Sequence, residues 1–250
     1  MYVLEDEQLS LAKIAALSII PGIIALIFDI IAAPLVLQSG YPLLFTLVLA
    51  NIIVLIPSEL LILIYLGYKK NKKVSIKGII PYRKSMPTKK LVIWIIILFA
   101  YGYAINMLMF PITGVLKNLF AWMPEVFFSV ESDVITTTNF QLYSSTALIT
   151  VLIVALLANA ILIPIIEEIY FRGFLLPRTS RFGKNAAIIN VSLWSIYHIW
   201  APWTIIANII IFLPIAYLVM KKQDVRLSIL GHMLANFMLV VMIVPLLITI

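Results

Sequence analysis

The residues best suited to chemistry in this sequence are two adjacent glutamates, Glu167 and Glu168, at the end of an apolar run of bilayer-spanning length. An ionisable side chain at membrane depth costs on the order of 2.5–3.5 kcal/mol on insertion scales, so a buried pair is a candidate functional site. Arg172 follows Glu168 by four residues, on the same helical face, and an ion pair is expected between them. Glu167 lies about 100° further round the helix, so we expect its carboxylate to face elsewhere and to be free.

The chain contains only two histidines, His198 and His232, and both lie in apolar runs. Asn236 follows His232 by four residues, so the two side chains share one helical face. Depths counted from the nearest basic loops, at about 1.5 Å per helical residue, overlap for Glu167, both histidines and Asn236. The sequence therefore predicts one shared site built from three helices, below the membrane midplane.

The elements that must position these residues are predicted to be transmembrane helices. Hydrophobic residues make up 63% of the 250 residues and charged residues 12%, which is typical of an integral membrane protein. We predict an all-α, polytopic transmembrane helix bundle forming a single domain over 1–250, with about seven to eight spanning helices. Residues 1–145 would supply N-terminal helices and loops, and 146–250 the catalytic core helices.

Seven spans are predicted, and a further segment, Val115–Val130, is interpreted as an interfacial or re-entrant helix. The predicted spans are Leu11–Leu37, Leu43–Tyr68, Leu91–Phe110, Thr146–Ile166, Ala186–Ile199, Ile205–Met220 and Leu227–Ile250. The first run is too long for a cleaved signal peptide and lacks a basic segment before it, so it is expected to remain as a helix. Asp29 and Glu59 lie inside the first two runs, where we expect burial against another helix; a pathway role is the alternative.

The charge pattern predicts the orientation in the cell membrane. The loop Lys69–Lys90 carries nine Lys or Arg and no acidic residue, which indicates a cytoplasmic loop and a cytoplasmic N-terminus. The candidate site would then open towards the cytoplasmic side, and the basic loop would touch lipid headgroups. The net charge of +7 sits mainly in loops and has no base-stacking face, so no nucleic-acid partner is expected. The absence of cysteine excludes a disulfide, a thiolate nucleophile and a cysteine-ligated metal.

Three ordered motifs resemble a known family. Glu167-Glu168-x-x-x-Arg172, Trp194-x-x-x-His198 and His232-x-x-x-Asn236 are similar to the signature of the CPBP intramembrane proteases, which include the type II CAAX prenyl endopeptidases and bacteriocin-immunity relatives. The resemblance runs from about Leu148 to the C-terminus. The second motif usually opens with Phe rather than Trp194, and relatives commonly have eight membrane helices where the sequence indicates seven.

The resemblance implies a peptide hydrolase whose chemistry suits these residues. Glu167 would act as general base on a water held by His198, and His232 and Asn236 would stabilise the oxyanion. Glu168, held by Arg172, would orient the helix; the sequence does not fix which glutamate is the base. No cofactor is expected, and the substrate would be a prenylated or other membrane-embedded peptide.

Three alternatives stay open at this point. In a zinc-dependent version, Glu167, His198 and His232 would be the ligands, although an amide such as Asn236 is a poor zinc ligand. A non-catalytic scaffold or bacteriocin-immunity protein could use the same residues as buried contacts. A transporter could use the two glutamates with Asp29 and Glu59 as a proton relay, but the sequence lacks the expected repeat symmetry.

Overall fold

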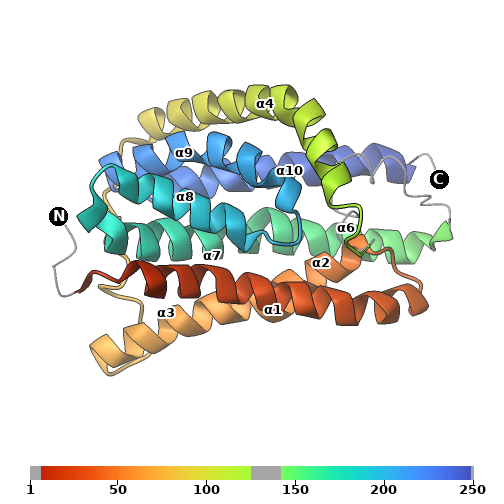
Figure 1. The fold of residues 1–250 in the computed structure, drawn as a ribbon, viewed down its shortest axis with the longest axis horizontal. Coiled ribbons are helices and arrows are strands. Elements are labelled where there is room, and N and C mark those ends of the chain that lie inside the picture. Colours follow the sequence, from red (N-terminus) through yellow and green to blue (C-terminus); the bar gives the residue numbers. More distant parts are fainter. Residues whose placement is uncertain (1–6, 125–141, 249–250) are drawn as a thin grey trace.

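The computed structural model describes residues 7–124 and 142–248, and this part of the chain is a bundle of long helices (Figure 1). No strand occurs among the described residues, which confirms the all-α prediction. The single helices are α1 (Leu11–Gln38), α4 (Thr88–Leu119), α8 (Asn185–Tyr197), α9 (Ile205–Lys222) and α10 (Arg226–Ile248). Two composite helices are α2–η2–α3 (Leu44–Ala50, Asn51–Leu55, Ile56–Asn71) and α6–η5–α7–η6–η7 (Ser145–Leu157, Ala158–Leu162, Ile163–Glu168, Ile169–Leu175, Leu176–Phe182).

Five helices of the described chain are long and apolar enough to span a membrane: Leu11–Gln38, Leu44–Asn71, Thr88–Leu119, Ser145–Phe182 and Pro202–Lys222. The predicted seven to eight spans are therefore not confirmed. Helix α8 has 13 residues, a rise of about 20 Å, which is shorter than a bilayer core of about 30 Å. In α10, the apolar stretch Arg226–Val241 is shorter than a span.

The two composite helices lie side by side and repeat the same local plan. Each contains a π-helical turn, η2 or η5, followed closely by a proline, Pro57 or Pro164. Proline lacks the N–H that an α-helix needs and clashes with the preceding turn, and a π-bulge accommodates both effects. Contacts between α2 and α6, η2 and η5, and α3 and α7 show that the two helices run parallel and in register.

An asparagine pair fixes that register. Asn51 of η2 donates a hydrogen bond of 2.8 Å from its side chain to the side-chain oxygen of Asn159 in η5. Glu59 follows Asn51 by eight residues, and Glu167 follows Asn159 by the same number. Parallel helices paired at the asparagines therefore bring the two glutamates to the same level of the bundle, about 12 Å further along.

Helices α8 and α9 form a short hairpin that turns inside the bundle. Pro202 and Trp203 lie in this turn, and Trp203 is fully buried against Phe120, with ring centroids 6.2 Å apart. The turn is covered by protein, because the C-terminal end of α4 packs on it. Irregular backbone at this depth is tolerated where protein surrounds it.

Helix α4 continues beyond its predicted end at Phe110 and runs through Pro111 to Leu119, with a visible bend in its second half (Figure 1). Internal prolines commonly bend helices. The first part of the predicted interfacial helix Val115–Val130 therefore belongs to α4. The part from residue 125 lies outside the described residues.

The basic loops gather at one end of the bundle, as the sequence predicts. The loop after α3, the start of α8 and the α9–α10 turn all lie at the left of Figure 1. Arg178, a basic residue at this end of the bundle, is buried. It donates to the carbonyl oxygens of Ile79 and Phe174 at 3.0 Å and pairs with Glu7 at 3.4 Å.

Candidate active site

Glu168 and Arg172 form the expected ion pair, with 3.3 Å between Oε2 of Glu168 and Nε of Arg172. Both side chains are fully buried. The guanidinium also stacks on the ring of Trp194, 4.5 Å from its centroid, and the other oxygen of Glu168 lies 3.1 Å from Nδ1 of His232. Glu168 therefore connects the first motif to the third, because one of its oxygens contacts Arg172 and the other contacts His232.

Glu167 is buried and is not free, contrary to the expectation from its helical position. Its Oε2 accepts a hydrogen bond of 3.3 Å from the indole Nε1 of Trp194, and its Oε1 accepts one of 3.2 Å from the hydroxyl of Tyr197. Both donors come from α8. The carboxylate is thus held in one orientation by neutral donors, while its neighbour Glu168 receives the cation.

Trp194 contacts several of the predicted site residues. Its ring lies 4.4 Å from that of His198 and 5.9 Å from that of His232, both edge to face. Phe212 of α9 packs on the same indole at 4.3 Å. The structure thus places both histidines, Glu167 and Arg172 in contact with one residue, whose only distinction in the sequence is that it opens the second motif.

His198 lies directly after the last residue of α8, with non-helical backbone, and its side chain is half-buried. Its Nδ1 is 2.8 Å from the carbonyl oxygen of Trp194. Because a carbonyl only accepts, we assign the proton to Nδ1, which leaves the Nε2 lone pair available to accept a hydrogen bond.

Asn236 stands apart from the other predicted residues. Its side-chain nitrogen donates to the backbone carbonyl of Asn159 at 2.8 Å, in the π-helical turn η5. That carbonyl is eight residues from Glu167 along the helix. One of the two amide hydrogens of Asn236 is used in this bond, and the second remains for another acceptor.

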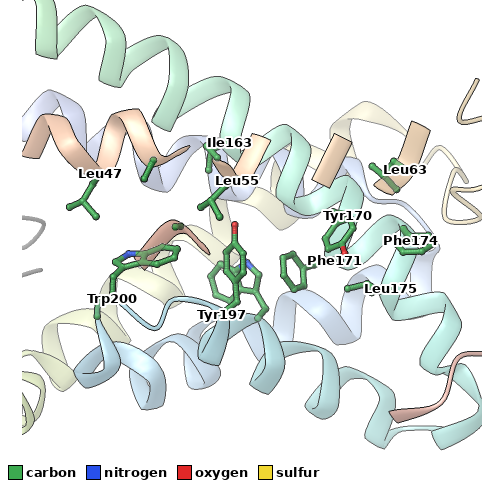
Figure 2. Packing of buried hydrophobic residues seen from close by; sticks show 14 of the residues in the cluster. Leu47, Leu55, Leu63, Ile163, Tyr170, Phe171, Phe174, Leu175, Tyr197 and Trp200 are labelled. Carbon is green, nitrogen blue, oxygen red and sulfur yellow. The ribbon is translucent and has the colours of Figure 1, made fainter. Parts of the chain in front are cut away.

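Two residues outside the predicted set enter the site. The hydroxyl of Tyr197 lies 3.0 Å from Oε1 of Glu59 as well as 3.2 Å from Glu167, and Glu59 is completely buried on α3. The sequence indicated that Glu59 is buried, but not that it reaches this site from the N-terminal half. In Figure 2 the ring of Tyr197 points from its helix towards Leu55, with its hydroxyl inside the apolar core. The eight-residue Asn–Glu spacing that the two composite helices share is the feature of the sequence from which the place of Glu59 beside Glu167 could have been predicted.

The metal alternative has no preformed ligand set in the described part of the chain, where no three His, Cys, Asp or Glu side chains are grouped to hold an ion. Nδ1 of His232 is directed at Glu168, and both oxygens of Glu167 accept other hydrogen bonds. A glutamate and two histidines would have to reorient to bind zinc in the tetrahedral geometry that it prefers.

Fold and site together define the class: an integral membrane protein of apolar helices with a buried carboxylate–histidine site. Residues 149–238 match the family described as type II CAAX prenyl endopeptidase, Rce1-like, a segment that contains all three motifs. The match covers 90 of the 250 residues and confirms that this segment resembles the CAAX-type proteases of the CPBP group, which are hydrolases. Comparison with curated proteins and with solved structures found no match.

Proposed function

We propose that this protein is an intramembrane endopeptidase that hydrolyses a peptide bond near the C-terminus of prenylated CAAX-type proteins, without a metal. The observation that carries the proposal is the arrangement around Trp194, where an oriented carboxylate, Glu167, and two imidazoles meet inside an apolar bundle. Peptide hydrolysis needs an activated water and a stabilised oxyanion, and these side chains can supply both.

In the proposed reaction Glu167 removes a proton from a water molecule while His198 holds that water through Nε2. The Nδ1–H contact of His198 with the Trp194 carbonyl supports this role, because it leaves Nε2 as an acceptor. The new bond forms between the water oxygen and the scissile carbonyl carbon. When the tetrahedral intermediate collapses, the carbon–nitrogen bond breaks, and Glu167 returns its proton to the leaving amine.

His232 and Asn236 are proposed to stabilise the oxyanion. Nδ1 of His232 lies 3.1 Å from Oε1 of Glu168, so Nε2 is the ring nitrogen that remains to interact with the oxyanion. Asn236 would contribute the amide hydrogen that the Asn159 carbonyl does not use. Loss of one oxyanion donor costs about 2.7–4 kcal/mol of transition-state stabilisation.

The proposal is tested by cleavage of quenched CAAX-type peptides, farnesylated, geranylgeranylated or unprenylated, by the purified protein in detergent. We expect the prenylated peptides to be cut, and Glu167→Gln to lower kcat by about 10²–10⁴-fold. Asp29→Asn, which alters a buried acid of α1 with no hydrogen bond to the site, is the matched control and should retain cleavage. A chelator should have no effect. Preserved biological function in Glu167→Gln without any cleavage would favour a scaffold instead.

A further inference from the structure

Tyr197 stands between two carboxyl groups and has one proton to donate. Its hydroxyl oxygen is 3.0 Å from Oε1 of Glu59 and 3.2 Å from Oε1 of Glu167. A hydroxyl donates one hydrogen bond and accepts others, so it cannot donate to both glutamates. If both contacts are hydrogen bonds, one of the two carboxyl groups must carry a proton and donate it to the tyrosine oxygen.

The remaining contacts of the two carboxyl groups distinguish them. Glu167 has a donor on each oxygen when Tyr197 donates to it, since Trp194 serves the other oxygen. Glu59 has no second partner, because its Oε2 is buried without a hydrogen bond among the described residues. Burying an oxygen without a hydrogen-bond partner costs more free energy on a charged carboxylate than on a neutral carboxylic acid, where the oxygen belongs to a carbonyl group. The proton therefore belongs on Glu59.

The charged and titratable groups near Glu59 lead to the same assignment. Among the described residues, the guanidinium at the site is that of Arg172, and it is paired with Glu168. The Tyr170 hydroxyl donates to the carbonyl oxygen of Leu17 at 2.9 Å and so does not serve Glu59. With Glu59 neutral, Arg172 has two nearby carboxylates, Glu167 and Glu168, rather than three. An ionised Glu59 would leave an unpaired charge in an apolar interior, which proteins avoid.

We propose that Glu59 is held as a neutral carboxylic acid and is a positioning residue for Glu167. The carboxylic O–H of Glu59 donates a hydrogen bond to the Tyr197 oxygen, and the Tyr197 hydroxyl donates a hydrogen bond to Glu167. This chain of two hydrogen bonds orients the Glu167 carboxylate and keeps it the ionised member of the pair. The consequence for catalysis rests on the proposed function, whereas the protonation of Glu59 does not.

Infrared spectroscopy of the purified protein tests the protonation directly, without any substrate. A neutral acid gives a carbonyl stretching band that a carboxylate lacks. At neutral pH the wild-type spectrum should contain a band from Glu59 that disappears in Glu59→Gln and persists in Glu167→Gln. Asp29→Asn is the matched control, because Asp29 and Glu59 are the two fully buried acids among the described residues of the N-terminal half. Any band that Asp29 contributes is then identified by its loss in this variant.

Cleavage of a prenylated peptide then tests the positioning role. Glu59→Gln keeps a neutral donor for Tyr197 and should retain most of the wild-type kcat with an unaltered pH profile. Glu59→Leu removes the donor and should lower kcat by about threefold to tenfold, the loss expected for one hydrogen bond between neutral groups. A higher kcat in Glu59→Gln than in Glu59→Leu would show that the hydrogen bond, and not only the packing of the side chain, matters.

Two results would overturn the proposal. One is a spectrum in which Glu59→Gln removes no carboxylic-acid band, or in which the band disappears with Glu167→Gln instead. The other is a shifted pH profile in Glu59→Gln, since this would mean that the variant had removed a negative charge. If no peptide is cleaved by any variant, the proposed function fails, and the infrared result still decides the state of Glu59.

Discussion

The indole nitrogen of Trp194 gives this site a hydrogen bond that phenylalanine, the more usual opening residue of the second motif, would not provide. Its N–H reaches Glu167 while its ring contacts both histidines and supports Arg172. The substitution that looked like a mild departure in the sequence thus has a specific structural consequence. Glu167 is oriented by two donors from α8 instead of one.

Trp194→Phe should therefore retain the fold and weaken catalysis. Phenylalanine keeps most of the aromatic contact but removes the N–H, and a net hydrogen bond to a charged group corresponds to about a tenfold or larger effect. We expect kcat for a prenylated peptide to fall by about tenfold, with a small change in unfolding temperature. An unchanged kcat would mean that the Trp194–Glu167 contact does not orient the base.

Residue spacing predicted some of these contacts and missed others for a physical reason. The i, i+4 separation of Glu168 and Arg172 fixes their shared face, and their ion pair is present. The position of Glu59 inside an apolar run also predicts that it is buried. It carries no information on a partner 138 residues away, so the contact with Tyr197 could not be derived from it. The free carboxylate expected for Glu167 was wrong for the same reason.

At the scale of elements, the position of α8 depends on a close approach to α1. A Cβ on Gly22 would collide with the backbone carbonyl oxygen of Tyr197, so only glycine permits this helix contact. Because backbone atoms cannot move aside as a flexible side chain can, a larger residue must push α8 away. Tyr197, Trp194 and His198 would move with it.

Gly22→Ala should consequently reduce both stability and activity. We expect a loss of about 1–3 kcal/mol in the free energy of unfolding, typical of overpacking, and a lower kcat. Gly114→Ala in α4 is the matched control, because no atom lies within 4 Å of the added Cβ. It should be neutral or slightly stabilising, since alanine favours helix over glycine. Equal behaviour of the two variants would contradict a tight α1–α8 contact.

The turn between α9 and α10 is tied to the basic loop by Asp224, outside the spans. Its carboxylate accepts from the backbone N–H of Met86 at 2.9 Å and from the guanidinium of Arg226 at 2.6 Å. Burial acts to raise the pKa of Asp224, but these hydrogen bonds and the Arg226 charge outweigh burial and hold that pKa below its ordinary value of 3.8.

A depressed folded-state pKa sets the sign of a pH effect. Asp224 contributes stability above its unfolded-state pKa, and this contribution is lost as the pH falls through the lower folded-state pKa. Asp224→Asn should lower the unfolding temperature at neutral pH and make the acid-side decline shallower than in the wild type. Thermal unfolding of both proteins from neutral to acidic pH measures this. Parallel curves would show that the Asp224 contacts do not stabilise the turn.

On the scale of the whole molecule, composition and apolar run length predicted the all-α membrane bundle and most helix positions. They did not predict that α4 continues through Pro111, nor that the α8–α9 hairpin turns inside the bundle under its end. Hydropathy measures only how apolar a segment is. Whether that segment meets lipid or another helix depends on packing partners that periodicity does not identify.

The absence of cysteine allows the predicted orientation to be measured with single introduced thiols. Lys73→Cys and Lys222→Cys lie in exposed positions at one end of the bundle, and Ser39→Cys is exposed after α1. With a membrane-impermeant reagent on intact cells, we expect Ser39→Cys to be labelled and the two lysine positions to be protected until the cells are broken. Labelling of Lys73→Cys but not Ser39→Cys in intact cells would reverse the orientation.

The most direct test of the central claim is hydrolysis of a farnesylated CAAX-type peptide in heavy-oxygen water, followed by mass spectrometry of the products. If Glu167 activates water, the wild type will release the terminal fragment and place one heavy oxygen in the new carboxylate, while Glu167→Gln will form this product at least about 10²-fold more slowly. Formation of the same labelled product at equal rates by both proteins would contradict the assignment of Glu167 as the base.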